Sequence, residues 1–239
     1  MKNILLLLLI FTGFIQSATA QWFGRERITN LENFDKRPIS WGYFLGFNSY
    51  DFKFEYNNRD LGNNTDIKVN KQFGFNVGMI GDLRINEYLN LRLEPGLFYT
   101  KRILSFPDDP RFINNLDKER EVPSAYIHIP LLLKVSTKRI HNFKPFITGG
   151  ISTAINLSHN SKNPDDNSQG EFRMKRNPLF YELGFGIDFY LEYFKFTPSI
   201  RGVFALTNEL VPDDNPSSPW TSNIHSMESR AVFINFTFQ

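Results

Sequence analysis

The sequence of 239 residues contains no cysteine, which excludes disulfide bonds and thiolate metal sites. Its formal net charge is +2, and removal of Lys2 with a predicted leader leaves about +1, which argues against a nucleic-acid partner attracted by a basic field. Aromatic residues make up 15% of the chain, yet its mean hydropathy is negative. This combination is typical of a lipid-facing β-barrel with alternating strands; the alternative is a soluble, aromatic-rich β-sandwich.

Residues 1–20 have the features of a signal peptide. Lys2 supplies the positive start, an apolar stretch covers 4–15, and Ala18-Thr19-Ala20 forms an A-x-A cleavage site. The apolar stretch of roughly 12 residues is shorter than the ~20 that a spanning helix needs, and no later stretch is apolar over that length. Residues 21–40 are charged and aperiodic, so we interpret them as a periplasmic lead-in to the main domain, which covers 41–239. Within this lead-in, Trp22 and Phe23 either dock on the barrel end or lie at the membrane surface; the alternative is a flexible tail.

Eight segments of the main domain alternate apolar and polar side chains with a period of two, as strands do. In the segment 89–102, four leucines share one face, while Arg92, Glu94 and Gly96 lie on the other. A water-exposed face normally gathers Lys, Thr and Ser, so this mixture favours a crowded polar lumen inside an apolar wall. The predicted strands cover 41–56, 71–85, 89–102, 122–137, 143–157, 179–190, 193–206 and 229–239.

Two irregularities are predicted within these strands. In 41–56 the apolar phase changes between Phe47 and Tyr50, which indicates a bulge or a bend near Asn48 and Ser49. Pro95 cannot donate a ladder hydrogen bond, so we expect it at a bulge or at a locally unpaired position.

The connections between the strands alternate between long and short. Long connections cover 57–70, 104–121, 158–177 and 207–228, and short ones cover 86–88, 139–142 and 191–192. Outer-membrane barrels have long outer loops and short periplasmic turns, and an even strand number lets the first and last strands pair. The sequence therefore predicts an all-β fold, an eight-stranded antiparallel transmembrane β-barrel of the small outer-membrane type with a side-chain-filled lumen. Both termini are expected in the periplasm, and strands longer than the ~9–11 residues needed to cross are expected to project beyond the outer surface.

Charged residues of both signs face the predicted lumen. A barrel of this size is just wide enough to be filled by side chains, and buried charges are tolerable only when they are paired. We therefore predict a plug of hydrogen-bonded ion pairs; the alternative is a narrow proton or ion path. The residues concerned are Arg92, Lys134, Arg201, Glu94, Glu182 and Asp188.

No catalytic constellation is visible in the sequence. His128 is the only histidine on a predicted strand, and Ser124 on the same face is about 13 Å away, too far to be a nucleophile activated by it. We interpret His128 as a lumen side chain that forms a hydrogen bond. The remaining histidines lack ligand spacing. We predict no catalytic, cofactor-binding or metal-binding residues and no cofactor.

Three predicted outer loops contain an acidic turn, at 107–110, 164–167 and 212–216. Pro and Asp are ordinary turn formers, and turns alone account for the pattern. The alternative is that these turns gather at one rim as a calcium or partner site, because carboxylate clusters suit hard cations.

Several strands resemble a known family over nearly the whole mature chain. The similarity lies in 41–48 (WGYFLGFN, followed by Asp51-Phe52), 91–97 (LRLEPGL), 129–134 (IPLLLK) and 181–190 (YELGFGIDFY, followed by YFKF at 193–196). On these stretches the chain resembles the PorT family, called SprT in gliding species. Its members are outer-membrane barrels of the type IX secretion and gliding system of Bacteroidetes.

The resemblance implies a non-enzymatic accessory or assembly factor of protein export, and of gliding where present, rather than the conduit. The implied partners are outer-membrane lipid, other type IX secretion components and, during biogenesis, the barrel assembly machinery. In many outer-membrane barrels this machinery reads an aromatic residue at the terminus; here Phe238 is followed by Gln239, so the match to that signal is imperfect. No nucleic acid is expected. Two other functions stay open: a structural or adhesive barrel that binds external ligands through its long loops, and a lipid-modifying barrel enzyme.

Overall fold

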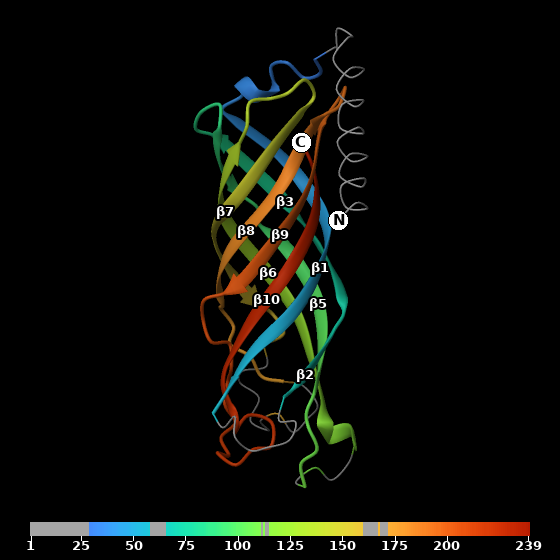
Figure 1. Cartoon of the computed structure of the whole chain (residues 1–239), viewed down its shortest axis with the longest axis vertical. Helices are drawn as coiled ribbons and strands as arrows, with labels where there is room; N and C mark the ends of the chain where they lie inside the picture. The colour runs from blue at the N-terminus through green and yellow to red at the C-terminus, as the bar shows by residue number, and fades with distance from the viewer. Residues whose placement is uncertain (1–28, 58–65, 111, 113–114, 160–166, 168–171) are drawn as a thin grey trace, which may run out of the picture.

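The computed structural model describes residues 29–57, 66–110, 112, 115–159, 167 and 172–239. The predicted signal peptide and the first part of the lead-in, 21–28, lie outside these residues. The described chain forms one antiparallel sheet that curls into a tall barrel (Figure 1). Its strands are β1 (Ile39–Tyr56), β2 (Lys68–Lys71), β3 (Phe73–Arg84), β4 (Leu89–Leu93), β5 (Gly96–Ser105), β6 (Glu119–Ser136), β7 (Phe143–Asn156), β8 (Leu179–Tyr190), β9 (Lys195–Ala205) and β10 (Ile224–Phe238), and its short 3-10 helices are η1 (Phe34–Lys36) and η2 (Asn115–Lys118).

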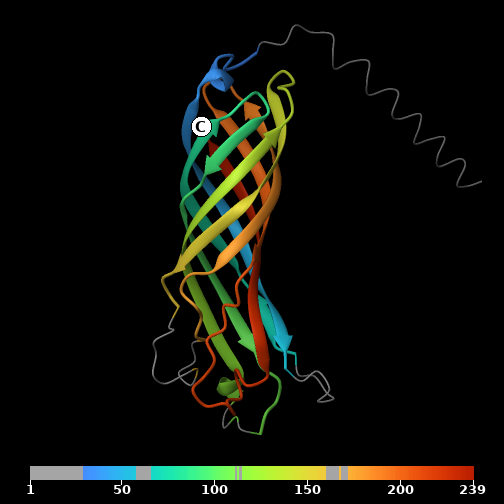
Figure 2. The ribbon, with the colours of Figure 1, turned by 90° about the vertical axis from the view of Figure 1, so that its left-hand side faces the viewer.

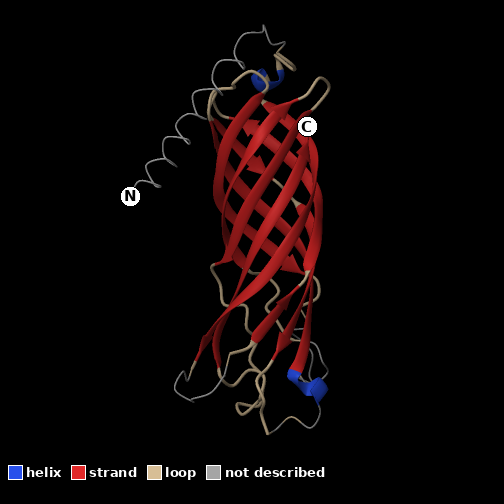
Figure 3. Ribbon diagram, turned by 45° about the vertical axis from the view of Figure 1, so that its right-hand side comes forward, coloured by secondary structure: helices blue, strands red, loops and turns tan. Residues whose placement is uncertain are grey.

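The sheet closes on itself and leaves no free edge around the middle of the barrel. Around the barrel, neighbouring strands follow the order β1, β10, β9, β8, β7 and β6. β4 and β5 lie end to end and together pair with β6 on one side and with β3 on the other. β3 then pairs with β1 from Ile39 to Ser49 and closes the barrel. The wall seen in Figure 3 therefore has eight positions, one of them shared by β4 and β5. β2 precedes β3 and extends its pairing with β5. The predicted eight-stranded antiparallel barrel is confirmed.

The middle of the barrel has an apolar outer wall. Most of the side chains that point outward from its strands are large and apolar, for example Leu183 and Phe185 of β8, which are 61% and 62% exposed. The residues between them, such as Glu182, are buried inside. This belt of exposed apolar side chains is the surface that a bilayer requires and that water does not tolerate.

The belt explains the change of apolar phase in β1, and the predicted bulge near Asn48 and Ser49 is wrong. Both residues keep an unbroken register with β3 and β10. Beyond Ser49 the strand leaves the belt, so polar residues such as Lys53 turn outward and Phe52 turns inward. The apolar residues change sides because the surroundings change, while the backbone continues without an inserted residue.

The same exchange of apolar and polar residues between the two faces explains why two strands begin earlier than predicted. The stretches 119–121 and 224–228, assigned to loops from the sequence, belong to β6 and β10. There the outward residues are charged, as at Glu121, and the inward ones include Val122 and Met227. Both β1 and β6 have 18 residues, about twice what crossing the bilayer requires, so the barrel continues beyond the belt as predicted.

Pro95 lies in the gap between β4 and β5, and this confirms the predicted unpaired position. The pairing of β3 keeps the same register on both sides of the gap, from Gly81 with Leu93 to Gly78 with Gly96, so no residue is inserted. The carbonyl of Pro95 still accepts a hydrogen bond from the Met79 amide at 3.0 Å. The ladder therefore lacks the hydrogen bond that the backbone amide of another residue would donate here, because proline has no N–H.

The two ends of the barrel differ. The short turns, the terminal Gln239 and the start of the described chain lie together at what we call the short-turn end, uppermost in Figures 1 and 2. The long connections lie at the opposite, long-loop end, where the strands project furthest (Figure 2). In the described residues, no helix is long and apolar enough to cross a membrane.

Candidate functional site

The interior nearest the short-turn end is filled by buried charges in ion pairs. Arg201 of β9 contacts two carboxylates at 2.9 Å, those of Glu94 and Glu182. Lys134 of β6 contacts Asp188 of β8 at 2.5 Å. All of these side chains are at most 7% exposed, so the predicted plug of paired charges is confirmed. Such pairing is what makes charges tolerable in a space closed off from water.

Asp82 of β3 is a partner in this network that the sequence analysis did not predict. Arg92 contacts Asp82 at 3.1 Å and Glu94 at 3.5 Å. Asp82 lies on the same inward phase of β3 as Asn76, so continuing that alternation would have identified it. Asn76 in turn donates to Asn235 and accepts a hydrogen bond from Asn48, which joins three neighbouring strands inside the wall.

His128 lies next to the charges, on the side away from the short-turn end, and is fully buried. One of its ring nitrogens, Nε2, is 2.6 Å from an oxygen of Glu182, which confirms the predicted hydrogen bond. Ser124, on the same strand, instead accepts a hydrogen bond from Arg102 at 2.9 Å. The rings of Phe98 and Phe233 pack against the imidazole, with centroids 5.0 Å and 5.7 Å away. The pair therefore sits between the charged layer and an aromatic layer.

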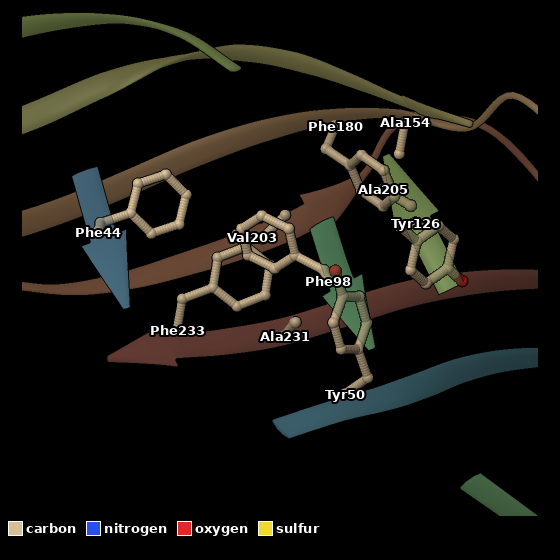
Figure 4. Close-up of a cluster of buried hydrophobic side chains, with 10 residues drawn as sticks. All are labelled: Phe44, Tyr50, Phe98, Tyr126, Ala154, Phe180, Val203, Ala205, Ala231 and Phe233. Carbon is tan, nitrogen blue, oxygen red and sulfur yellow. The ribbon is translucent and has the colours of Figure 1, made fainter. Parts of the chain in front are cut away.

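The aromatic layer spans the barrel at mid-height. Rings from β1, β5, β6, β8 and β10 point toward a common centre, as Figure 4 shows. The closest pair is Phe98 and Phe233, with centroids 4.8 Å apart, and Tyr50 stacks on Tyr126 at 5.5 Å. Phe180 also packs against His128, with centroids 5.7 Å apart. The cross-section is thus occupied by interlocked rings, as an eight-stranded barrel requires.

Beyond the rings, a second polar layer surrounds Arg102. Its guanidinium donates to Ser229, Ser124 and Tyr126 at 2.9–3.2 Å and stacks over the ring of Phe52 at 3.9 Å. The nearby carboxylate of Glu209 accepts hydrogen bonds from the amide and hydroxyl of Ser229. Glu209 is fully buried outside the belt, and this burial raises its pKa above the ordinary value.

The long-loop end has a hydrophobic core of its own. Met174 and Leu210 join two of the long connections by a β-bridge within that core. A third connection is tied in by Trp220, whose indole donates to the Asp117 carbonyl at 3.0 Å and lies under the Arg120 guanidinium. The remaining core side chains are Phe52, Leu104, Phe106, Val122, Phe172, Ile224 and Met227. These connections are therefore packed together over the barrel mouth.

The acidic turns are used for structure at two of the three places. Asp108 pairs with Lys118 at 2.6 Å. Asp213 is buried and accepts hydrogen bonds from Asn167 at 2.7 Å, Ser218 at 2.5 Å and Arg173 at 3.3 Å. The acidic pair at 165–166 lies outside the described residues. In the part of the chain that the structure covers, no group of three or more potential ligands could hold a metal ion. Because the third acidic pair lies outside those residues, the calcium alternative stays a prediction.

The described part of the lead-in caps the short-turn end. Asp35 accepts a hydrogen bond from the Tyr190 hydroxyl at 2.6 Å, and the Phe34 ring packs edge-on against Tyr190. Asn30 donates to the Asn142 side chain at 2.9 Å, and Arg139 donates back to the carbonyl of Asn30. Residues 30–38 are therefore docked on the barrel, while Trp22 and Phe23, for which docking was considered, lie outside the described residues.

The closed sheet, its apolar belt and its polar interior define a transmembrane β-barrel of the small, filled kind. The chain belongs to the outer membrane protein beta-barrel domain family, whose model matches residues 16–211. Membership of this family indicates that the protein is located in the outer membrane.

Comparison with solved structures returns small outer-membrane proteins. OprG from Pseudomonas aeruginosa is 14% identical, with a TM-score of 0.45, over 84% of this chain and 93% of that one. Neisserial surface protein A is 10% identical, with a TM-score of 0.42, over 84% and 98%. Ail, the attachment invasion locus protein of Yersinia pestis, is 11% identical, with a TM-score of 0.36, over 84% and 98%. No curated protein sequence matches the chain.

Proposed function

We propose that this barrel is a non-enzymatic accessory or assembly factor of protein export by a type IX secretion system, and of gliding where that occurs. The observation that carries the proposal is the filled lumen. Paired charges around Arg201, the rings around Phe98 and the Arg102 layer follow one another along the axis. A polypeptide cannot pass such an interior, so the role belongs to the outer surfaces, the loops or the capped end.

The resemblance of the strands to the PorT family supports the export part of this proposal. The stretch 181–190 carries the most specific part of it. In β8 its outward residues form the belt and its inward residues Glu182 and Asp188 belong to the ion-pair network. In this proposal the short-turn end and both termini face the periplasm, and the partners are other components of the export machinery.

A clean deletion strain tests the proposal. We expect cargo proteins to accumulate in the periplasm, gliding to stop where the parent glides, and the wild-type gene to restore both. The secretome is measured by mass spectrometry of culture medium and periplasm, with an unrelated small barrel deleted as the control. A normal secretome in the deletion strain contradicts the export role.

A second candidate is a structural or adhesive barrel. It is favoured by the organised long-loop end, where Trp220 and Arg120 tie packed connections together into a defined surface. A normal secretome together with lost binding of an external ligand would support it. Altered lipid A in the same strain would instead point to the third alternative, a lipid-modifying enzyme.

A further inference from the structure

A cavity of about 200 Å³ opens at the short-turn end, between the capping segment and two of the turns. A water-sized space of about 20 Å³ shares Asp35, Arg84 and Lys144 with it and reaches Asp82 in the barrel interior. We call the two spaces together the vestibule. The larger one is lined by Glu32, Asp35, Lys36, Arg84, Glu87, Lys138, Arg139 and Lys144.

The vestibule has an excess of positive charge. Its larger space is lined by five basic and three acidic side chains. The smaller space adds Arg37 and Lys195 as further cations, while its carboxylate, Asp82, is already paired with Arg92. Of the three acidic residues, Asp35 is held by the Tyr190 hydroxyl. A mobile anion that enters therefore meets a positive field.

Four cations of the larger space form no ion pair with a carboxylate in the described part of the chain. Lys144 is only 9% exposed, and its ammonium donates to a neutral oxygen, the Glu87 carbonyl at 3.1 Å. Lys36 likewise donates to the amide oxygen of Asn33. The side chains of Arg84 and Lys138 form no hydrogen bond or ion pair with the described residues. A nearly buried ammonium without a counterion is costly, and a bound anion removes that cost.

We propose that the vestibule binds a small oxyanion of the phosphate class, either as a free ion or as the headgroup of a phospholipid. The planar guanidinium of Arg84 suits two oxygens of one phosphate, and Lys138 and Lys144 add point charges across the cavity. This inference does not depend on the export role.

The surroundings of the vestibule suit a lipid source for that phosphate. Ile85 and Tyr88, at 56% and 42% exposure, lie in the same turn region as Arg84. Ile140, 42% exposed, follows Arg139 in the other turn. Exposed apolar and aromatic residues beside basic ones are the arrangement found where a protein meets lipid headgroups.

The test uses the full mature chain, folded in zwitterionic detergent or in nanodiscs. Calorimetry at low ionic strength measures binding of inorganic phosphate, and native mass spectrometry measures retention of phosphatidylglycerol against phosphatidylcholine. We expect saturable binding of at least one probe, weakened at least tenfold by Arg84→Gln/Lys138→Gln. The matched control, Lys53→Gln/Lys101→Gln, removes two cations at the long-loop end and should leave binding unchanged.

The arms of the experiment distinguish the sources. Heat of binding for inorganic phosphate, with equal retention of the two lipids, identifies a free anion as the ligand. Selective retention of phosphatidylglycerol over phosphatidylcholine identifies a lipid headgroup. The proposal is overturned if neither probe binds or if the Arg84→Gln/Lys138→Gln variant binds as tightly as the wild type. It is also overturned if the control variant Lys53→Gln/Lys101→Gln loses as much affinity as Arg84→Gln/Lys138→Gln does. Heat-modifiable migration of every variant in gel electrophoresis confirms that each barrel is folded.

Discussion

Replacement of Arg201 by methionine tests the ion-pair network most sharply. The guanidinium contacts the carboxylates of Glu94 and Glu182, both at 2.9 Å, and all three side chains are at most 7% exposed. A hydrogen bond to a charged partner contributes about 1.5–3 kcal/mol, so two such bonds give about 3–6 kcal/mol. Because Glu94 keeps Arg92 at 3.5 Å and Glu182 keeps His128 at 2.6 Å, the lower part of that range, about 3–4 kcal/mol, is expected.

The measurement is the free energy of unfolding of the detergent-folded barrel in urea, at one pH and one detergent concentration. The matched control is Lys101→Met, which breaks the exposed pair with Glu121 and should cost less than about 1 kcal/mol. The double variant Arg201→Met/Glu182→Met removes one of the stranded carboxylates and should recover part of the loss. If Arg201→Met costs no more than Lys101→Met, the network does not stabilise the barrel as argued.

Two further predictions concern the wall and the long-loop end. A methyl group on Gly150 would overlap the backbone oxygen of Leu131, so Gly150→Ala should cost more than about 3 kcal/mol in the same unfolding assay. The control Gly149→Ala should cost less than about 1 kcal/mol. Equal costs for the two variants would contradict the packing described for Gly150. The raised pKa of Glu209 means that the folded state binds the carboxyl proton of Glu209 more tightly than the unfolded state does. The protonated carboxyl therefore contributes its full stabilisation below the ordinary carboxyl pKa, and this stabilisation is lost as the pH rises through the raised pKa. Hydrogen exchange of the Ser229 amide should therefore quicken with pH beyond its intrinsic increase, and Glu209→Gln should abolish that excess; an unchanged excess in the variant would refute the assignment.

The sequence predicted the parts of the fold that one repeating environment controls. β8 has the predicted bounds, Leu179 and Tyr190, because its outward residues all meet the belt and its inward residues all meet the lumen. β6 and β10 begin earlier than predicted, because beyond the belt water replaces lipid and charged residues such as Glu121 become normal outward strand residues. A search that assumed apolar residues outside along the whole strand could not recognise this part.

The candidate site was predictable in its components and not in its contacts. Alternation placed Arg201 and Glu182 inside, but their contact, like that between His128 and Glu182, depends on strand register and on the tilt that closure imposes. The cap is a different case. Residues 30–38 have no period, and their docking depends on single contacts, such as that of Asp35 with Tyr190, which no pattern reports.

The central claim is that the lumen is closed, so that the protein acts through its surfaces. Single-channel recording of the purified, folded chain in a planar lipid bilayer tests this claim most directly. We expect the current to stay at the level of the bare bilayer, because the rings of Phe98 and Phe233 and the ion pairs of Arg201 fill successive cross-sections. Reproducible, discrete conductance steps from the wild-type protein would contradict the claim and make a conduit the better account.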